Sequence, residues 1–446
     1  MKIIIAGDGD TGCHLARQLC TENQDVVLIG EDRKRLEELD SRNNIMVQEG
    51  SGVMPSSLRD AGVAGCDLFI GVTPWGNENI VSSQLAKALG AKRTVARIDN
   101  GELISDSMRD LLRGTGIDIA VYPEYLVARE IRSLLRHNWV KQWFELHDGA
   151  LVIVGVKVKA DSELAGRHLY ELLKSEHPLH VAAIRRKGST IIPRGDSQIR
   201  SNDILYLSML PEVADRVAGM CGHKPRKVQK IMISGAGKLT RQIAQALAGS
   251  GYHITVIDSD SARCHKLSMR FPSLTVVNSD QRDYEVLCDE GLESCDVFIA
   301  ANGSSEMNIV GSMLAKDAGV PWTIAEIEDI QYFTEAENLN IDVVVNKKLL
   351  TSSTILQMLL DSKNMETSRC LSLEDADVSE IVAAPGARIT RGAVKDLKLP
   401  DGMTLAGLVR DGQGMLVSGD THIQAGDHVV VFSLSGSLNK YEKLFR

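Results

Sequence analysis

The sequence lacks the features that mark membrane-spanning, secreted and metal-binding chains. No apolar run approaches the roughly 18 residues that a membrane-spanning helix requires, and the opening residues are too few for the core of a signal peptide. None of the eight cysteines belongs to a C-x-x-C pair, which excludes the common zinc and thioredoxin-type motifs. We therefore predict a cytoplasmic protein whose cysteines are free thiols, most of them packed in cores. Cys13 keeps a second interpretation, a redox role, because it follows a glycine turn where a helix N-terminus lowers a thiol pKa.

The sequence also lacks an excess of positive charge and the common catalytic motifs. Its formal net charge is −9, so composition gives no support to a nucleic-acid partner. The patterns G-x-S-x-G, H-E-x-x-H and G-x-x-x-x-G-K-[ST] do not occur. His177 and His180 lie in a predicted loop without an acid-rich motif beside them. These absences leave no candidate catalytic residue and no candidate metal ligand.

What the sequence does contain is a long internal repeat. Residues 64–98 align without gaps to residues 293–327 and are identical to them at fifteen of 35 positions. The stretch "KIIIAGDG" near the N-terminus matches "KIMISGAG" at residues 230–237. A period of about 228 residues is too long for a solenoid repeat and indicates two domain-sized halves.

Each half begins with short β-rich runs that alternate with amphipathic helical patterns, and it ends with short strands and turns. We predict an α/β protein with two Rossmann-like, doubly wound parallel-sheet lobes, each followed by a small α+β lobe. The predicted boundaries are 1–138 and 139–222 for the first pair of lobes, 223–229 for a linker, and 230–365 and 366–446 for the second pair. The two small lobes share G-D-x-x-I-x-x-x-D, whose Gly-Asp pairs at 195–196 and 419–420 are predicted to be hairpin turns.

The stretch "AGDGDTG" in the first half has G-x-G-x-x-G spacing, at Gly7, Gly9 and Gly12. It follows a predicted strand and opens a predicted helix, as dinucleotide-binding loops do. The first glycine permits the tight turn, the second lets the backbone approach a pyrophosphate, and the third lets helix and strand pack closely. The phosphate is expected on the N–H groups at the start of the helix. The candidate site also includes the loop residues Asp8, Asp10 and Thr11 and, after the next strand, Gly30, Glu31 and Asp32, where a carboxylate takes ribose hydroxyls.

The second copy of this loop differs at the third glycine. Gly235 and Gly237 are kept, but Thr240 replaces the third glycine, and its β-branched side chain is expected to push the helix away from the strand. Asp258 supplies an acid where the first half has Gly30, and Lys238 is placed to contact a phosphate. With Ala236 and Leu239 these residues form the second candidate site, which we expect to bind a dinucleotide less tightly than the first.

Further candidate binding residues follow the other predicted strands, because ligands of open α/β sheets bind beyond the carboxyl ends of strands. Arg97 and Glu326 occupy matched positions with opposite charge. The complete set is Ser51, Thr73, Pro74 and Arg97 in the first half and Ser279, Asp280, Ala301, Asn302 and Glu326 in the second.

The doubled order of large lobe, helix and small lobe resembles the RCK-type regulators of potassium transport, which are built of TrkA-N and TrkA-C domains. The resemblance covers nearly the whole chain and is carried by "KIIIAGDGDTG", "SCDVFIAANGSSEMNIVGSMLAK", "IDVVVNKKLL" and "DLKLPDGMTLAGLVRDGQGMLVSGDTHIQAGDHVVVF". It implies a regulatory subunit, peripheral on the inner face of the cell membrane, that binds NAD(H), with ATP or ADP as further candidate ligands. It also implies a homo-oligomeric ring docked on a membrane potassium-translocating subunit of the TrkH/TrkG-like kind. The sequence departs from the family pattern at Gly30, where an acid is usual, and at Thr240, where glycine is usual.

Two classes of function follow from these patterns. The leading one is a ligand-gated regulatory protein without chemistry of its own, in which binding changes the angle between lobes. The alternative is an NAD(P)-dependent oxidoreductase, which requires a substrate domain with a polar acid/base cluster. The doubling of diverged lobes favours the regulatory class, and a small-ligand sensor in the small lobes, for c-di-AMP for example, would add to it. The helices at "YLVAREIRSLLRH" and "LTSSTILQMLLD" are predicted to exchange contacts between lobes in an oligomer, with packing inside the chain alone as the alternative.

Overall fold

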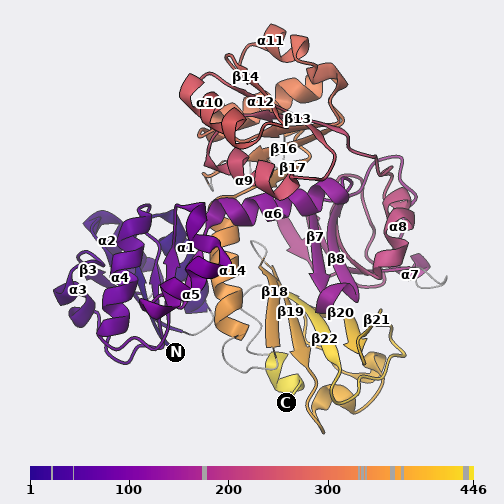
Figure 1. Cartoon of the computed structure of the whole chain (residues 1–446). Helices are drawn as coiled ribbons and strands as arrows, with labels where there is room; N and C mark the ends of the chain where they lie inside the picture. The colour runs from indigo at the N-terminus through magenta and orange to yellow at the C-terminus, as the bar shows by residue number, and fades with distance from the viewer. Residues whose placement is uncertain are drawn as a thin grey trace. The chain divides into compact units, whose positions relative to one another are not determined.

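The computed structural model describes residues 1–446 apart from 22–23, 44, 173–177, 330–331, 333–335, 337–338, 362–366, 373–375 and 435–440. The chain forms two compact units, Met1–Ile131 with Lys230–Leu356, and Arg132–Gln229 with Gln357–Arg446. The first unit therefore combines the large lobes of both halves, and the second combines the small lobes (Figure 1). Each of the two predicted kinds of lobe thus lies beside the other copy of the same kind.

The first large lobe is a six-stranded parallel sheet in the order β3-β2-β1-β4-β5-β6. Its strands β1 and β4 are buried almost throughout, as strands covered by helices on both faces are. The strand order reverses between β1 and β4, and this is the place where such sheets bind ligands. The strands are β1 (Lys2–Ala6), β2 (Asp25–Gly30), β3 (Met46–Glu49), β4 (Leu68–Gly71), β5 (Thr94–Arg97) and β6 (Ile119–Val121). The helices are α1 (Asp10–Thr21), α2 (Arg33–Asn43), α3 (Pro55–Asp60), α4 (Gly76–Ala88), α5 (Asp106–Gly114) and α6 (Pro123–Arg136).

The second large lobe repeats this topology, with the order β14-β13-β12-β15-β16-β17. Its strands are β12 (Lys230–Ser234), β13 (His253–Asp258), β14 (Thr275–Asn278), β15 (Val297–Ala300), β16 (Trp322–Glu326) and β17 (Val343–Val345). Its helices are α9 (Lys238–Leu247), α10 (Ser261–Arg270), α11 (Tyr284–Asp289), α12 (Ser305–Asp317) and α14 (Lys347–Asp361). The predicted pair of doubly wound parallel sheets is confirmed.

The small lobes are five-stranded antiparallel sheets in the orders β10-β9-β11-β8-β7 and β21-β20-β22-β19-β18, so the repeat extends to their topology. The first contains β7 (Gln142–Leu146), β8 (Leu151–Lys157), β9 (Leu179–Arg186), β10 (Ser189–Ile191) and β11 (Ile204–Met209), with α7 (Leu169–Leu172) and α8 (Ala214–Met220). The second contains β18 (Thr367–Ser372), β19 (Ala376–Val382), β20 (Met403–Arg410), β21 (Gln413–Met415) and β22 (His428–Leu434).

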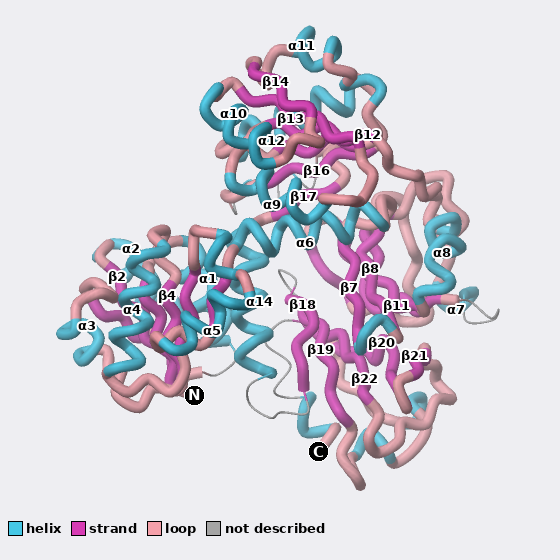
Figure 2. The backbone as a smooth tube through the Cα atoms, in the orientation of Figure 1, coloured by secondary structure: helices cyan, strands magenta, loops and turns pink. Residues whose placement is uncertain are grey.

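The two small sheets lie side by side (Figure 2), and one apolar core joins them. The Tyr206 ring of β11 lies 5.5 Å from the Phe432 ring of β22, measured between centroids. A Cβ on Gly407 would come within 2.6 Å of Leu151, so the sheets meet too closely there for a side chain. The remaining members of this core include Leu146 and Ile153 from the first sheet and Val378, Val409 and Val430 from the second.

The Gly-Asp pairs at 195–196 and 419–420 lie in turns, but the prediction that they form the hairpins is wrong. The tight hairpins β9–β10 and β20–β21 turn instead at Lys187–Gly188 and Asp411–Gly412. Their φ values are 49° and 82° in the first pair and 52° and 77° in the second. Two successive residues with positive φ are typical of type I′ turns, whose twist matches that of the strands.

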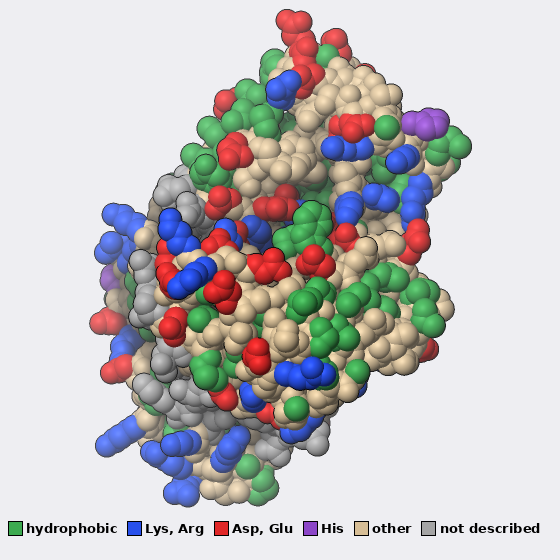
Figure 3. All heavy atoms as spheres, turned by 90° about the vertical axis from the view of Figure 1, so that its left-hand side faces the viewer, with side chains coloured by type: hydrophobic (Ala, Val, Ile, Leu, Met, Phe, Trp, Pro, Cys, Tyr) green, Lys and Arg blue, Asp and Glu red, His purple; other side chains and the backbone are tan. Residues whose placement is uncertain are grey.

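Among the described residues, no helix has both the length and the apolar content needed to cross a bilayer. On the face drawn in Figure 3, acidic and basic side chains are intermixed over the middle of the surface, and basic side chains gather at its lower left.

Candidate functional site

The glycine loop of the first lobe connects β1 to α1, and two of its three glycines are required by the loop itself. Gly7 has φ +128°, and a Cβ there would lie 2.8 Å from the Thr73 backbone nitrogen. A Cβ on Gly12 would lie only 1.9 Å from the Gly7 carbonyl oxygen. A Cβ on Gly9, by contrast, would meet no atom within 4 Å. The space beside Gly9 is therefore open for a ligand that approaches the backbone.

The second loop, between β12 and α9, has the same division of roles. Gly235 has φ +102° and packs against the end of β15, whereas a Cβ on Gly237 would meet nothing within 4 Å. Thr240 is fully buried, and its hydroxyl donates a hydrogen bond of 2.5 Å to the Gly235 carbonyl oxygen. Because Thr240 has a Cβ, α9 cannot approach this carbonyl as closely as α1 approaches that of Gly7. The hydroxyl fills the added space, so the third-glycine position keeps a contact to the loop in both lobes.

In each lobe an aspartate ties the glycine loop to the end of the second strand. The aspartate belongs to the loop in the first lobe and to the strand in the second. In the second lobe, Asp258 at the end of β13 accepts the Ala236 N–H of the glycine loop at 2.6 Å. In the first lobe, Asp8 of the glycine loop accepts the N–H groups of Glu31 and Asp32, just after β2, at 2.8 and 2.6 Å.

This exchange explains the glycine at position 30. A Cβ on Gly30 would lie 2.4 Å from the Asp8 Cβ and 2.5 Å from its Oδ2. The Asp8 carboxyl group thus occupies the place where an acid at position 30 would project. The missing acid of the first lobe is supplied by the loop, and Gly30 makes room for it.

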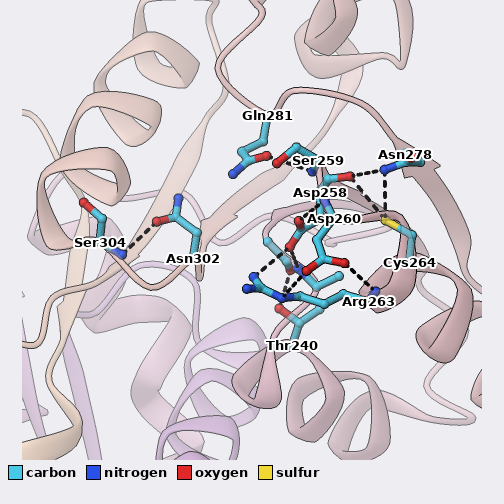
Figure 4. Close-up of polar contacts among 12 residues, drawn as sticks. Thr240, Asp258, Ser259, Asp260, Arg263, Cys264, Asn278, Gln281, Asn302 and Ser304 are labelled. Atoms are coloured by element: carbon cyan, nitrogen blue, oxygen red, sulfur yellow. Dashed lines mark hydrogen bonds and ion pairs between the residues drawn. The ribbon is translucent and has the colours of Figure 1, made fainter.

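An arginine lies over this junction in each lobe, at matched positions of α2 and α10. Arg35 donates from Nη1 to the Asp8 carbonyl oxygen at 3.3 Å and lies 3.6 Å from an Asp32 carboxylate oxygen. Arg263 contacts Asp258 at 3.7 Å and Asp260 at 3.1 Å (Figure 4). Both arginines are about half exposed and able to reach a bound phosphate or ribose.

A buried asparagine fixes the ends of two neighbouring strands in each lobe, β4 and β5 in the first and β15 and β16 in the second. Asn79 has no exposed surface, accepts the Thr73 N–H at 2.8 Å and donates to the carbonyl oxygens of Thr73 and Arg97. Asn308 makes the same contacts with Asn302 and Glu326. The amides thereby hold the candidate rim residues in place.

The remaining predicted residues have more varied positions. Asp280 forms a two-pronged ion pair with Arg282, whose hydrogen bonds lower the Asp280 pKa to about 2. The two neighbours of the glycines, Thr11 and Leu239, are buried. Pro74 is exposed, Ala301 is buried, and Ser51 and Ser279 are partly exposed.

One lysine–aspartate pair links each glycine loop to the opposite half of the repeat. Lys348 on α14 lies 2.6 Å from Asp10, and its hydrogen bond lowers the Asp10 pKa. Lys238 at the start of α9 lies 3.6 Å from an Asp99 carboxylate oxygen and donates to the Asp99 carbonyl at 3.1 Å. Local sequence does not indicate Lys348 or Asp99 as partners, because this pairing depends on how the two halves meet.

A small pocket opens where the first of these pairs lies. It is lined by Thr11, Arg97, Pro123, Glu328, Lys347, Lys348 and Thr351. Three of the lining side chains are basic and one, Glu328, is acidic, so the lining has an excess of positive charge that could attract a phosphate. Lys347 is already paired with Glu328 and Lys348 with Asp10, so a phosphate would compete with these carboxylates. Arg97 lines this pocket, whereas Glu326, at the matched position of the second lobe, is buried beside Lys347.

Glu326 is the most strongly perturbed of the candidate rim residues. It is 3% exposed, and burial raises its pKa to about 7 even though the Lys347 ammonium lies 3.6 Å away. Lys347 is shared with Glu328, whose pKa it holds below the ordinary value against the effect of burial.

Replacing Glu326 by glutamine should therefore change how stability depends on pH. Between about pH 4.5 and 7 the folded chain keeps a proton that the unfolded chain releases, so this residue removes stability as pH rises. We expect Glu326→Gln to raise the free energy of unfolding by about 1–3 kcal/mol at about pH 8 and to leave it nearly unchanged at about pH 4.5. Urea denaturation at both pH values measures this. The control Glu328→Gln should instead destabilise at high pH, and equal effects of both variants would contradict the assignment.

The cysteine beside the first loop has the packing role. Cys13 is buried, its thiol donates to the Asp8 carbonyl oxygen at 3.1 Å, and burial raises its pKa. A thiol with a raised pKa is a weak nucleophile, which disfavours the redox interpretation.

Comparison with known proteins agrees with this architecture. The TrkA-N domain family matches residues 3–123 and 231–347, and the TrkA-C domain family matches residues 153–222 and 378–446. The chain is 29% identical over its full length to all of a Trk system potassium uptake protein TrkA homolog from Archaeoglobus fulgidus. It is 30% identical, again over its full length, to 99% of the Trk system potassium uptake protein TrkA of Haemophilus influenzae.

Solved structures show the same fold at lower identity. The chain matches the GsuK RCK domain over its whole length, with a TM-score of 0.59 and 17% identity. The match covers 94% of the GsuK domain. The structure described as GsuK channel bound to NAD gives a TM-score of 0.58 at 16% identity, with the whole chain matching 78% of that protein. The two TrkA relatives are named for potassium uptake, and none of these four names gives an enzyme activity. The chain belongs to the TrkA family of potassium uptake proteins, with two TrkA-N and two TrkA-C domains.

Proposed function

We propose that this chain is a nucleotide-binding regulatory subunit of a Trk-type potassium uptake system. It binds NAD(H) at its glycine loops and acts from the inner face of the membrane, as a homo-oligomeric ring, on a potassium-translocating subunit of the TrkH/TrkG-like kind. The observation that carries this proposal is the state of Gly9 and Gly237, which are open to a ligand at helix N-termini while the glycines before them are held by backbone contacts. The likeness to the NAD-bound GsuK channel supports the choice of dinucleotide.

The lysine–aspartate pairs give a route from nucleotide binding to movement. A phosphate on the first loop would compete with the Asp10 carboxylate for Lys348, which belongs to the other half. A phosphate on the second loop would likewise draw Lys238 away from Asp99. Binding thus changes the contacts between the halves, and a coupling free energy of about 1–3 kcal/mol is enough for typical allosteric control.

The two sites are expected to differ in affinity, with the first the tighter. Asp8 is already engaged by two backbone N–H groups and does not confront a phosphate at the loop. The first site also lies beside the basic pocket of Arg97, Lys347 and Lys348. In the second site Asp258 is buried and bonded to the Ala236 N–H, which removes one loop donor from a ligand.

Calorimetric titration of NADH into Gly9→Ala and Gly237→Ala tests the proposal. Neither new methyl group meets an atom within 4 Å, so both variants should fold normally and differ only in ligand approach. We expect Gly9→Ala to weaken the tighter binding phase by about ten- to a hundredfold, the effect of losing a charge-assisted bond.

Four results would contradict it. If the unaltered chain did not bind NADH, the proposal of a dinucleotide ligand would be wrong. If it bound ATP or ADP tightly instead, one of these nucleotides would replace NAD(H) as the ligand. Loss of the tighter phase in Gly237→Ala would reverse the order of the sites. Steady oxidation of NADH with a panel of small carbonyl compounds would favour the oxidoreductase alternative.

A further inference from the structure

Outside the nucleotide-binding lobes, three potential metal ligands converge in the unit of the small lobes. His147, Glu380 and His428 each offer one nitrogen or oxygen atom, and these atoms lie within 4.8 Å of one another. The His428 Nδ1 lies 2.6 Å from Glu380 Oε1, and the His147 Nδ1 lies 3.6 Å from the same oxygen. Among the described residues this is the one group of its kind.

The three side chains come from both copies of the repeat. Glu380 on β19 and His428 on β22 lie two residues apart in register on the same face of the second small sheet, because Glu380 pairs with Val430 and Val382 pairs with His428. Val430 belongs to the apolar core that the two small sheets share. His147 follows directly after Leu146, another member of this core, at the end of β7. The cluster therefore lies at the rim of the interface between the small lobes.

His147 is held there by an unusual backbone conformation. Its φ is +47°, in the left-handed region that few residues other than glycine adopt. Such conformations persist where the surrounding structure requires them, and they are concentrated at ligand sites. The turn at His147 brings its ring to 4.7 Å from the ring of His428, measured between centroids.

The first small lobe does not carry the same residues. In the shared register, Gly155 opposite Tyr206 corresponds to Glu380 opposite Val430, and Ile204 corresponds to His428. Neither glycine nor isoleucine can ligate a metal. Within the part of the chain that the structure describes, the cluster is therefore single and not one of a symmetric pair, and we expect any ion bound there to have a stoichiometry of one per chain.

We propose that His147, Glu380 and His428 bind one divalent transition-metal ion of the zinc type, which links the two small lobes. Two imidazoles and one carboxylate form a ligand set that suits zinc and leaves a fourth position for water or another ligand. Zinc bonds of about 2.0–2.2 Å place neighbouring ligand atoms about 3.4 Å apart in a tetrahedron. The two separations from Glu380 Oε1, 2.6 and 3.6 Å, lie on either side of that value, and all three ligand atoms lie within 4.8 Å of one another, so metal binding requires the side chains to rotate.

Titration of the chelator-treated full-length chain with Co²⁺ tests this inference. Tetrahedral Co²⁺ absorbs visible light strongly, and Zn²⁺ should displace it and abolish the signal. We expect one equivalent per chain, and we expect His428→Ala and Glu380→Gln to weaken binding at least about tenfold, since even groups that only support a ligand have effects of that size. His147→Asn is the third variant, because asparagine tolerates positive φ and keeps the turn.

The matched control is His422→Ala, which removes an exposed histidine of the same small lobe outside the cluster. It should bind Co²⁺ as the unaltered chain does. Failure of the unaltered chain to bind a stoichiometric ion would overturn the proposal, as would full affinity in both histidine variants of the cluster. In either case the three residues form only a hydrogen-bonded group between the lobes.

Discussion

Replacing Gly30 by aspartate should destabilise the first large lobe by about 3–5 kcal/mol, and adding Asp8→Ala to the same chain should restore most of that stability. The new Cβ would lie 2.4 Å from the Cβ of Asp8, a distance that no packing can accept. Overpacking of this kind costs roughly 1–3 kcal/mol. The displaced Asp8 carboxylate would also lose the N–H groups of Glu31 and Asp32 and would meet a second carboxylate.

The double variant reproduces the arrangement of the second lobe, where alanine follows the first glycine and Asp258 supplies the acid. The two substitutions share one space, so their effects should be far from additive. Hydrogen exchange of peptides from β1 and α1 measures the stability of this lobe separately from the rest of the chain. It is compared among the unaltered chain, Asp8→Ala, Gly30→Asp and the double variant. Additive effects of Asp8→Ala and Gly30→Asp would contradict the exchange of roles. The same cycle with Ala236→Asp and Asp258→Gly in the second lobe is the matched control, and it should show coupling of the same sign.

The architecture of the large lobes could be predicted from the sequence because local pattern and repeat agree. Apolar runs such as "KIIIA" and "DVVLI" are buried strands in a parallel sheet, and the repeat places the same elements in the second half. The strands β6 and β17 were not predicted, since three residues give too little pattern to recognise. The hairpins of the small lobes turn at Lys187–Gly188 and Asp411–Gly412 and not at the Gly-Asp pairs, because a type I′ turn needs a positive φ at two successive residues. Asp-Gly is a pair that this turn prefers, so the second hairpin is encoded locally, whereas Lys187 gives no such indication.

The polar details of the site depend on contacts between distant segments and were largely beyond sequence reasoning. In other dinucleotide sites the acid follows the second strand, and the sequence pattern predicts it after β2. In this lobe Asp8 of the glycine loop provides the carboxylate instead and accepts the Glu31 N–H. Nothing local predicts that Lys348 reaches Asp10 across a separation of 338 residues. The repeat does contain one indication of these contacts. Asn79 and Asn308 are identical in the two halves, and both hold strand ends together.

The aspartate that closes the shared motif of the small lobes gives the second large expected effect. Asp427 is 2% exposed and accepts two hydrogen bonds from Arg410, at 2.7 Å each, and a third from the Gln424 N–H. Asp203 and Arg186 form the same pair in the first small lobe. Burial acts to raise the pKa of Asp427, but these hydrogen bonds outweigh it and the pKa lies below its ordinary value.

We expect Arg410→Met to destabilise the second small lobe by about 3–5 kcal/mol near neutral pH, because it leaves a buried carboxylate without its partner. In the unaltered chain the pair stabilises the fold above the unfolded pKa of about 4, and its contribution is lost as pH falls through the lower folded pKa. In the variant, burial without Arg410 raises the pKa of Asp427, so the folded chain becomes protonated first on acidification. The difference in stability between the two chains should therefore shrink as pH falls from about 7 to about 4.

Hydrogen exchange in β20 and β22, together with urea titrations at both pH values, measures this difference, with Arg186→Met as the matched variant in the other lobe. Adding Asp427→Asn to Arg410→Met removes the charge and should recover part of the loss, and a difference that does not change with pH would show that Arg410 acts through packing alone.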